Sequence, residues 1–434
     1  MDVIEKKIVD IEKTRDMFWE LYPNKTAAER NEMIRELAFA LIQEIPLETT
    51  DTMVAKASYN LLRGRILNLS PEFDRKCEEH LSRAVKMNPE LSEAWRELGE
   101  CWLKKGDPQS AVYCFQESLK RNRTAKCLCA LATARRYENA MMSTKKDVVN
   151  SHEESIRLCL EAVTTEPQNS FAWYSLGNAY LMQFFTKNQQ NVKTLESARK
   201  AYETALRLGD DLHLPELHIN YASALKFDQR YAECLKHLKL AYKYNPGMVE
   251  CQERLHNLNS FLVRTNEAVR RKGRIKPKRL ADMLKSMKAE DDLATVDSLF
   301  MHKGIPAEVK PFSSLHEGLN RGVIIYGKVV GAVPVDDEVF YTFVACDKKG
   351  DCFAFTVYNY SPKFEMVIGD DLLLFEPFKV KVQVSGVRDE SSDSDIDIDI
   401  NLIRIPTPLG LIKNGKFLGP ESSAPCAVRM SFSK

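Results

Sequence analysis

Two short segments of the sequence contain residues whose types and spacing could do chemistry. Gly410-Leu-Ile-Lys-Asn-Gly-Lys-Phe417 has the spacing of a phosphate-binding loop, but Phe417 replaces the magnesium-binding Ser or Thr and Pro420 excludes the helix that should follow. Cys127 and Cys129 have ligand-like spacing without a second ligand pair, which favours small core residues. The eight histidines form no metal pair and no nucleophile–base motif. We therefore expect no catalysis, no metal and no cofactor.

A different chemistry, phosphate binding by cations, is indicated between Arg264 and Lys288. Ten basic residues face two acidic ones there, a local net charge of +8 in a chain whose net charge is +1. The centre of this segment has no aromatic residue for base stacking, so contacts to a nucleic-acid backbone would be independent of sequence and sensitive to salt. A nuclear import signal and a solvated linker are the alternatives. The candidate phosphate-binding residues are Lys272, Arg274, Lys276, Lys278 and Arg279.

An internal repeat supplies the scaffold for the first part of the chain. Trp95-Arg-Glu-Leu-Gly-Glu-Cys-Trp102 and Trp173-Tyr-Ser-Leu-Gly-Asn-Ala-Tyr180 resemble the first helix of a tetratricopeptide repeat. The two tryptophans are 78 residues apart, as are Pro89 and Pro167, which corresponds to two periods with about ten extra residues. We predict five repeats near residues 56–89, 90–123, 124–168, 169–213 and 214–247.

Further segments are expected to extend or interrupt these repeats. Two polar insertions, near Tyr137–Ser151 and Gln183–Lys193, predict surface loops. The first 47 residues predict two amphipathic helices, broken around Pro23, that extend the solenoid. A helix around 248–268 would cap the last repeat, which cannot bury its own apolar face.

Counting positions within the repeats identifies residues that would face a concave groove. Glu216 and Glu250 are 34 residues apart at equivalent positions and could together bind one cation of a peptide; the alternative is two solvated surface charges. Arg136 would face the groove and bind an acidic group or a carbonyl of the ligand. Asn178 and Asn220 could pair with the ligand backbone or satisfy a neighbouring repeat. The acids disfavour the acidic chaperone tails that related cochaperones bind.

The hydrophobic pattern changes from helical to strand-like beyond about residue 296. Strands are predicted over Val323–Val330, Val339–Val344, Cys352–Val357, Leu372–Phe375 and Ile400–Ile405. Five short strands indicate a small Greek-key barrel of the OB type. Because Lys328 and Tyr341 alone do not make a nucleic-acid platform, a protein-docking or structural barrel is at least as well supported. Residues 385–400 carry six acids and one Arg and predict a mobile acidic loop, in which Ser391, Ser392 and Ser394 could be phosphorylated.

The predicted architecture is therefore an α+β multidomain chain, an all-α tetratricopeptide-repeat solenoid followed by a small OB-type β-barrel. We expect amino-terminal helices over 1–55, repeats and cap over 56–268, a basic joint over 269–295, and the barrel with its acidic loop over 296–434. No apolar run of about 18 residues predicts a membrane span. A charged start and eleven irregularly spaced cysteines favour the cytosol or nucleus.

Several segments together resemble one family over essentially the whole chain. They are Trp173–Leu181, Glu216-Leu-His-Ile-Asn220, Lys272-Gly-Arg-Ile-Lys-Pro-Lys-Arg279 and Gly327-Lys-Val329, which are similar to the tetratricopeptide repeat protein 5 family. The resemblance implies repeats, a basic joint and a barrel in this order. It also implies that the peptide groove uses Arg136, Glu216 and Glu250, and that Lys276 and Lys278 contact ribosomal RNA.

The function implied by this resemblance is that of a monomeric, non-enzymatic adaptor in tubulin autoregulation. Such a factor binds the nascent amino-terminus of α- and β-tubulin near the ribosomal exit tunnel. It then recruits an mRNA-decay adaptor and a deadenylase complex, so that tubulin mRNA decays. The rival hypothesis is a nuclear scaffold of a transcriptional coactivator complex in the stress response, with the basic joint as an import signal. Because the family is described in both roles, the expected location is both cytoplasmic and nuclear.

Overall fold

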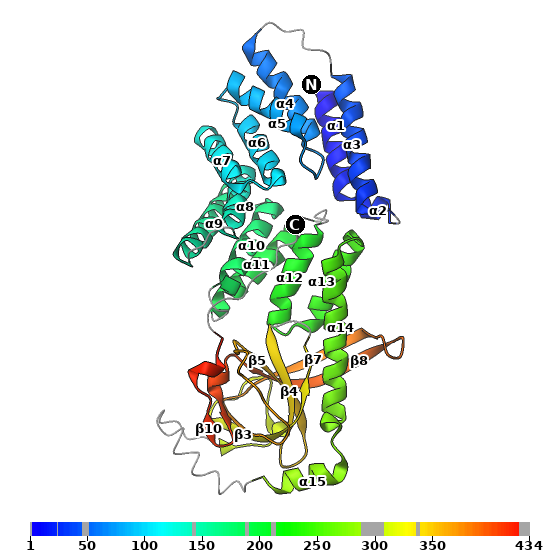
Figure 1. The fold of residues 1–434 in the computed structure, drawn as a ribbon, viewed down its shortest axis with the longest axis vertical. Coiled ribbons are helices and arrows are strands. Elements are labelled where there is room, and N and C mark those ends of the chain that lie inside the picture. The colour runs from blue at the N-terminus through cyan, green and yellow to red at the C-terminus, as the bar shows by residue number, and fades with distance from the viewer. Residues whose placement is uncertain are drawn as a thin grey trace. The chain divides into compact units, whose positions relative to one another are not determined.

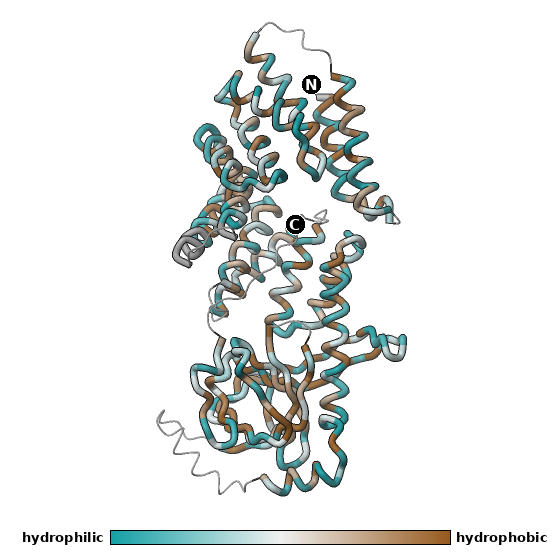
Figure 2. The backbone as a smooth tube through the Cα atoms, viewed as in Figure 1, coloured by the Kyte–Doolittle hydropathy of each residue, from teal (hydrophilic) through white to brown (hydrophobic). Residues whose placement is uncertain are grey.

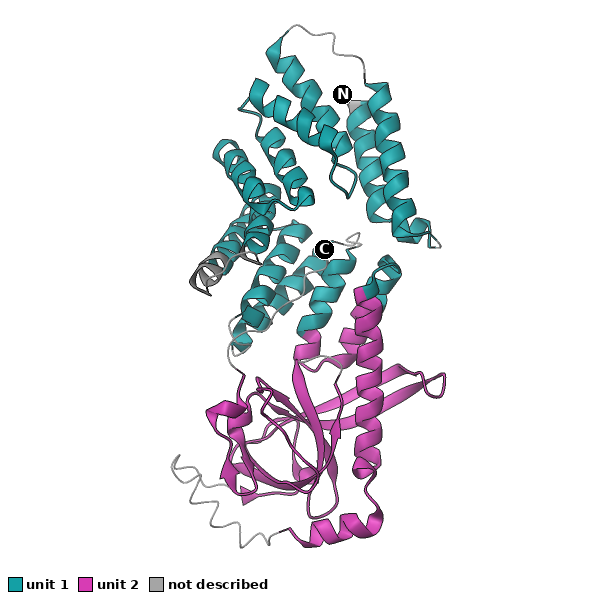
Figure 3. Ribbon diagram, in the orientation of Figure 1, with its two compact units in different colours: residues 1–187, 191–224, 239–249 teal, residues 188–190, 225–238, 250–434 magenta. Residues whose placement is uncertain are grey.

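The computed structural model describes residues 2–23, 25–45, 52–140, 145–186, 191–209, 214–287, 308–335 and 339–424. The chain divides into two compact units, which Figure 3 shows in different colours. The first unit is helical and contains residues 1–187, 191–224 and 239–249; the second contains 188–190, 225–238 and 250–434 and includes the β-sheet. The two units are groups of residues that pack together, and the boundary between them divides the last predicted repeat. They therefore do not test the domain boundaries expected from the sequence, which stay predictions.

Five helix pairs correspond to the five predicted repeats (Figure 1). Each pair joins a first helix, which carries the Leu-Gly signature where it is present, to a second helix that packs against it. The pairs are α4 (Met53–Leu67) with α5 (Arg75–Met87), α6 (Ser92–Lys105) with α7 (Pro108–Arg121), α8 (Ala125–Ala140) with α9 (Lys145–Thr165), α10 (Ser170–Thr186) with α11 (Val192–Leu208), and α12 (Pro215–Phe227) with α13 (Tyr231–Tyr244).

The signature residues hold each repeat together through contacts that recur along the chain. Trp95 and Trp173 each donate an indole hydrogen bond of 2.8 Å, to the carbonyl oxygens of Pro89 and Pro167. A Cβ atom on Gly99 would lie 2.6 Å from the Phe115 ring, so the glycine lets α6 and α7 cross closely. The Trp, Leu-Gly and Pro spacing in the sequence therefore reports helix packing.

The two insertions differ from their predicted form. Both were expected as surface loops, but α8 continues to Ala140, α9 begins at Lys145, α10 continues to Thr186 and α11 begins at Val192. Most of the extra residues lengthen the helices, because they contain few helix breakers. Residues 141–144 and 187–190 lie outside the described residues.

The amino-terminal helices belong to the first unit. They are α1 (Asp2–Asp16), α2 (Phe18–Leu21) and α3 (Ala27–Glu44), and the chain breaks near Pro23 as predicted. Ile8 and Ile34 are buried and form one apolar cluster with Ile66 of α4. Thr26 and Glu29 form a capping box that fixes the start of α3.

A ten-stranded sheet forms the barrel of the second unit. The strands are β1 (Glu308–Val309), β2 (Gly318–Leu319), β3 (Val323–Val333), β4 (Phe340–Cys346), β5 (Cys352–Tyr358), β6 (Asp371–Phe375), β7 (Phe378–Asp389), β8 (Ser394–Ile405), β9 (Leu411–Lys413) and β10 (Lys416–Phe417). They run in the order β10-β9-β6-β3-β4-β5-β8-β7-β2, with β5 and β8 parallel and β1 parallel to β3. Figure 2 shows hydrophobic residues concentrated within this barrel, where the rings of Phe343 and Phe355 stack at 5.1 Å.

The interpretation of residues 385–400 as a mobile loop is wrong. These residues form most of the β7–β8 hairpin, in which Val384 pairs with Ile398 and Val382 with Ile400. Ile398 and Ile400 are buried, whereas Asp397 and its neighbouring acids are exposed. The alternation of Asp and Ile thus has the two-residue period of a strand with one buried face. The high charge of the segment led to its interpretation as a loop.

The end of the last repeat and a long helix pack on the barrel within the second unit. The Tyr358 hydroxyl of β5 donates a 3.1 Å hydrogen bond to the carbonyl of Phe227, and the two rings lie 4.6 Å apart. The helix α14 (Val249–Arg270), found where the capping helix is predicted, places Phe261 5.2 Å from Phe340 of β4. A short turn η1 (Lys272–Arg274) and α15 (Pro277–Lys285) follow it.

Candidate peptide-binding site and basic surface

Polar side chains from α10, α11 and α12 form one hydrogen-bonded network in the first unit. The amide oxygen of Asn178 accepts hydrogen bonds from the Tyr202 hydroxyl at 2.8 Å and from the Asn220 amide at 3.1 Å. Asn178 also acts on the Tyr174 hydroxyl, where it opposes the rise in the pKa that burial causes. The two asparagines predicted as peptide contacts therefore bind each other. A ligand could bind only to the amide groups that this network does not use.

Arg136 lies beside this network. Counting positions within the repeat predicts only that its side chain faces the groove, whereas the structure also shows its burial and its hydrogen-bond partners. Its side chain is buried, with 8% of the residue exposed. Its guanidinium donates hydrogen bonds to Ser155 Oγ at 2.9 Å and Thr133 Oγ1 at 2.8 Å. No carboxylate of a described side chain forms an ion pair with it. A buried cation with neutral partners is costly, and an anionic ligand would stabilise it.

Glu216 and Arg136 both act electrostatically on Tyr174, so all three lie in one neighbourhood. Burial raises the pKa of Tyr174 to about 12, the Glu216 carboxylate contributes in the same direction, and Arg136 opposes it. Glu216 is exposed in the first turn of α12. The first unit therefore combines a carboxylate, a buried guanidinium and amide groups, which is the chemistry needed to bind a peptide that carries both charges.

Glu250 lies in the second unit, in the first turn of α14. Its carboxylate is half-buried and pairs with Arg254 Nη2 at 2.6 Å, one helical turn further along. Glu250 is therefore not a bare surface charge, because Arg254 already compensates it. The clamp of one ligand cation by Glu216 and Glu250 stays a prediction.

The basic joint is a folded segment within the described residues, so the solvated-linker alternative is wrong for residues 270–287. Lys272, Gly273 and Arg274 all have positive φ angles, of 47°, 66° and 58°. A Cβ atom on Gly273 would lie 2.0 Å from the carbonyl oxygen of Val330, so only glycine permits this approach of η1 to β3. Residues 288–295 lie outside the described residues.

The cations of the joint differ in how they are compensated. Arg274 pairs with Glu267 at 2.7 Å, and Arg271 pairs with the same carboxylate at 3.5 Å. Lys276, Lys278 and Arg279 are exposed around the start of α15, and no carboxylate among the described side chains pairs with them. These three side chains are the cations best placed to bind phosphate groups.

Sequence reasoning missed two further lysines of this surface. Lys348 and Lys349 are exposed in the tight β4–β5 turn, which Gly350 closes with a φ of 85°. The Lys272 ammonium lies 3.4 Å from where a Cβ atom of Gly350 would be, so this turn adjoins the basic joint. The Asp-Lys-Lys-Gly-Asp segment between two strands was a visible turn signal, but its neighbour in space was not predictable.

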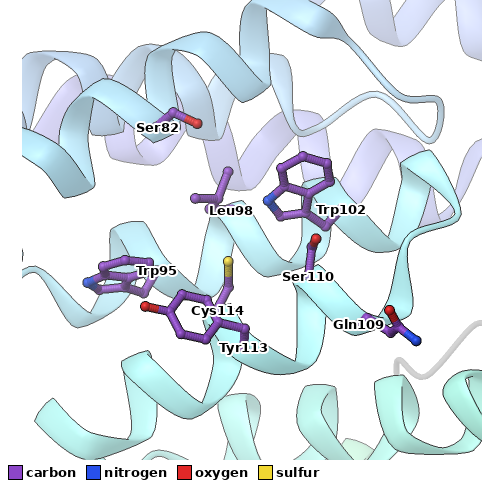
Figure 4. Close-up of a pocket in the computed structure, with 8 residues that line it drawn as sticks. All are labelled: Ser82, Trp95, Leu98, Trp102, Gln109, Ser110, Tyr113 and Cys114. Carbon is purple, nitrogen blue, oxygen red and sulfur yellow. The ribbon is translucent and has the colours of Figure 1, made fainter.

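Two cavities of the first unit involve other residues. A cavity of about 420 Å³ is lined by side chains of α5, α6 and α7, three of them aromatic (Figure 4): Ser82, Trp95, Leu98, Trp102, Gln109, Ser110, Tyr113 and Cys114. The second, of about 320 Å³, is lined by charged side chains that include Glu97, Glu100 and Lys126, and by Thr133, the partner of Arg136. The second cavity therefore adjoins the environment of Arg136.

The segments that imitated catalytic motifs have structural roles. Cys127 and Cys129 are buried in the repeat core. Residues 410–417 form the end of a 3₁₀ turn and the tight hairpin of β9 and β10. Among the described residues no group of three His, Cys, Asp or Glu side chains could hold a metal ion. No helix in the described ranges is long and apolar enough to cross a membrane.

Comparison with solved structures finds other helical repeat proteins. TTC0263, a thermophilic TPR protein of Thermus thermophilus, is 18% identical with a TM-score of 0.36, over 52% of this chain and 96% of its own. YrrB, a TPR protein described as having an unusual peptide-binding site, is 12% identical with a TM-score of 0.32, over 50% and 96% of the two chains.

Comparison with protein families and curated proteins is more specific. Residues 306–427 match the tetratricopeptide repeat protein 5 OB fold domain, and residues 92–125 match a tetratricopeptide repeat. Tetratricopeptide repeat protein 5 of Homo sapiens is 31% identical over 420 residues, which cover 95% of this chain and 92% of that protein. The Mus musculus protein is 31% identical over 419 residues, with the same coverage. These repeats make the chain a protein-interaction adaptor, and it belongs to the tetratricopeptide repeat protein 5 family.

Proposed function

We propose that this protein is a non-enzymatic adaptor that recognises the nascent amino-terminal peptide of α- and β-tubulin at the ribosome and triggers decay of tubulin mRNA. Family membership supports the proposal, because the family resemblance noted in the sequence implies this role. The proposal assigns peptide recognition to Arg136, Asn178, Asn220 and Glu216 of the first unit together with Glu250, and ribosome contact to the basic surface of the second unit.

The environment of Arg136 is the observation that carries the proposal. Its guanidinium is buried and bonded to the hydroxyl groups of Ser155 and Thr133, with no described carboxylate as partner. Tubulin begins Met-Arg-Glu, and the Glu of this peptide supplies the missing anion. A charge-assisted hydrogen bond to a buried guanidinium is stronger than one between neutral groups, so this contact would dominate affinity.

Carboxylates of the adaptor would bind the Arg of the same peptide. Glu216 is exposed and lies close enough to Tyr174 to raise its pKa, which places it in the neighbourhood of Arg136. Glu250 occupies the equivalent position one repeat later in the sequence. Binding there requires the peptide arginine to replace or join Arg254, which pairs with Glu250 now.

Contact with the ribosome is assigned to Lys272, Arg274, Lys276, Lys278 and Arg279. Lys276, Lys278 and Arg279 are exposed and pair with no carboxylate of the described side chains. Such cations release counterions when they bind a phosphate backbone, which favours association with ribosomal RNA. From there the adaptor would recruit the mRNA-decay adaptor and the deadenylase complex. A cytoplasmic protein with a nuclear pool is expected, since the rival role as a transcriptional coactivator scaffold uses the same basic joint.

The proposal is tested by binding of a Met-Arg-Glu-initiated tubulin peptide to the full chain, measured by calorimetry. Arg136→Ala should weaken binding by on the order of 100-fold, since a buried charged hydrogen bond is worth about 2–3 kcal/mol. The adjacent Arg135→Ala is the matched control, because Arg135 already pairs with Glu138 at 2.7 Å. Equal affinity of the Arg136→Ala variant and the unsubstituted protein would refute the assignment of this site.

The peptide's own sequence provides the second half of the test. A Met-Arg-Gln peptide should lose as much affinity for the unsubstituted protein as the Met-Arg-Glu peptide loses on Arg136→Ala. The two losses should not add when the changes are combined, because both remove the same contact. Additive losses would show that Arg136 contacts a different part of the peptide.

A further inference from the structure

Two cysteines face each other at the end of strands β4 and β5, beside the basic joint. Cys346 and Cys352 are directly paired in the antiparallel register, and they flank the tight turn that contains Lys348 and Lys349. The backbone amide of Asp347 donates to the carbonyl of Asp351 at 3.0 Å, so the adjoining cysteine pair falls at a position without backbone hydrogen bonds. Cα atoms at such positions are about 4.5 Å apart, within the range that a disulfide spans.

The two cysteines differ in exposure. Both are free, and a hydrogen bond between their thiols is the largest influence on the pKa of each. The bond from Cys352 lowers the pKa of Cys346, burial opposes this, and the Lys272 ammonium assists it. Asp347 and Asp351 are the nearby acids that act against the thiolate. Cys352 is half-buried, whereas the other nine cysteines of the described residues are buried.

We propose that Cys346 and Cys352 form a reversible cross-strand disulfide when the protein encounters hydrogen peroxide. Cys346 is the favoured thiolate of the pair, because the hydrogen bond with Cys346 and burial both raise the pKa of Cys352. Transfer of the shared proton from Cys352 to Cys346 places the negative charge on Cys352, which is the partly exposed residue of the two and the one that a peroxide can reach. The Cys352 thiolate attacks one peroxide oxygen, the O–O bond breaks, and the hydroxide released takes up a proton from solvent to become water. The Cys346 sulfur then attacks the sulfenic acid on Cys352, the S–O bond breaks, and a second water leaves with the thiol proton.

The chain contains its own matched control for this chemistry. Cys77 on α5 and Cys101 on α6 are also hydrogen-bonded to each other, and Lys104 assists the thiolate of Cys101 as Lys272 assists that of Cys346. Both of these cysteines are buried, with 1% exposed. The two pairs therefore share their local chemistry and differ in access, which is what the proposal requires for selectivity.

The experiment treats the reduced full chain with hydrogen peroxide, alkylates remaining thiols and analyses non-reduced peptides by mass spectrometry. A Cys346–Cys352 cross-linked peptide should form on the order of tenfold faster than any Cys77–Cys101 cross-link, and dithiothreitol should remove it. Cys346→Ser should leave Cys352 as a sulfenic acid that dimedone traps, and Cys352→Ser should abolish both products.

Three outcomes would overturn the proposal. Persistence of both thiols at peroxide concentrations that oxidise the unfolded chain would show that the pair is protected. Equal rates for the two pairs would show that oxidation follows general unfolding. A disulfide between Cys352 and any other cysteine would show that the cross-strand partner is wrong. Circular dichroism of the two serine variants checks that each remains folded.

Discussion

Gly273 approaches Val330 so closely that a Cβ atom on the glycine would lie 2.0 Å from the valine carbonyl oxygen. This contact fixes η1, and with it Lys272 and Arg274, against β3. Gly273→Ala should therefore destabilise the local packing, because both the positive φ and the clash must be accommodated. The loss of local unfolding free energy should be about 1–3 kcal/mol larger than the loss caused by a positive φ alone, because overpacking usually costs this much. Hydrogen exchange of the β3 amides, followed by mass spectrometry in the full chain, measures it.

Gly386 provides the matched control for this substitution. Its φ of 67° is nearly the same as that of Gly273, but no atom lies within 4 Å of where its Cβ would be. Gly386→Ala should cost about 1–2 kcal/mol, the usual penalty for a left-handed residue. Similar protection of β3 in the two variants would show that the contact with Val330 does not hold the joint.

The exposed lysines of the joint should determine the salt dependence of ribosome binding. Lys276→Glu combined with Lys278→Glu removes two cations that no described carboxylate neutralises, and so two candidate phosphate contacts. The slope of log affinity against log salt should become shallower by about one to two units. Sedimentation of the purified protein with ribosomes over a salt series measures this slope.

A control with the same charge change uses lysines that are already paired. Lys310 pairs with Glu308 at 3.1 Å and Lys381 with Asp399 at 3.7 Å. Replacing both with Glu should leave the salt slope nearly unchanged, whereas Lys348→Glu with Lys349→Glu should reduce it, because that turn adjoins Lys272. A slope that changes equally in all three double variants would indicate a response to net charge, with no defined basic surface.

The repeat architecture was predictable because its signals are local contacts that recur. Trp95 and Trp173 each bond to a proline carbonyl six residues earlier, so their spacing directly reports structure. The burial of Arg136 was not predictable in the same way. Position counting gives the direction of a side chain along its own helix, but the hydroxyl of Ser155 comes from α9, across an insertion of irregular length.

Charge concealed the second feature that sequence reasoning missed. The Asp-Ile-Asp-Ile-Asp-Ile400 segment has the alternation of a half-buried strand, but its net charge favoured a solvated loop. In the structure Ile398 and Ile400 are on the buried face of the strand and the aspartates are on the exposed face. The segment therefore has the alternation of a strand and the charge of a solvated surface at the same time. Likewise the composition of the basic joint is that of a linker, and the Gly273 contact that folds it depends on β3, more than fifty residues later.

The β7–β8 hairpin makes a prediction that a mobile loop would not. Ile398 is 2% exposed, so Ile398→Ala should destabilise the second unit by about 2–4 kcal/mol through the cavity it leaves. Asp395→Ala, on the exposed face of the same strand, loses a surface ion pair with Arg388 at 3.6 Å and should cost less than about 1 kcal/mol. Hydrogen exchange of the β7 and β8 amides distinguishes the two variants. Rapid exchange in the unsubstituted protein, or equal effects of both changes, would contradict the hairpin.

His237 on α13 should make the second unit sensitive to mild acid. Burial lowers its pKa from the ordinary value of 6.5 to about 4, with Lys236 adding to the shift. The unfolded chain takes up this proton near pH 6.5 and the folded chain only near pH 4, so stability falls as pH falls through that window. The stability that the neutral His237 contributes is fully present above pH 6.5. At low pH at most about 3 kcal/mol of unfolding free energy is lost through this group. His237→Gln should flatten the pH dependence of thermal unfolding between these values. His316→Gln serves as the control, because this histidine is exposed and its ring nitrogen lies 3.0 Å from the backbone carbonyl of Glu317. Identical pH profiles for His237→Gln and the unsubstituted protein would show that this imidazole is not kept neutral by the fold.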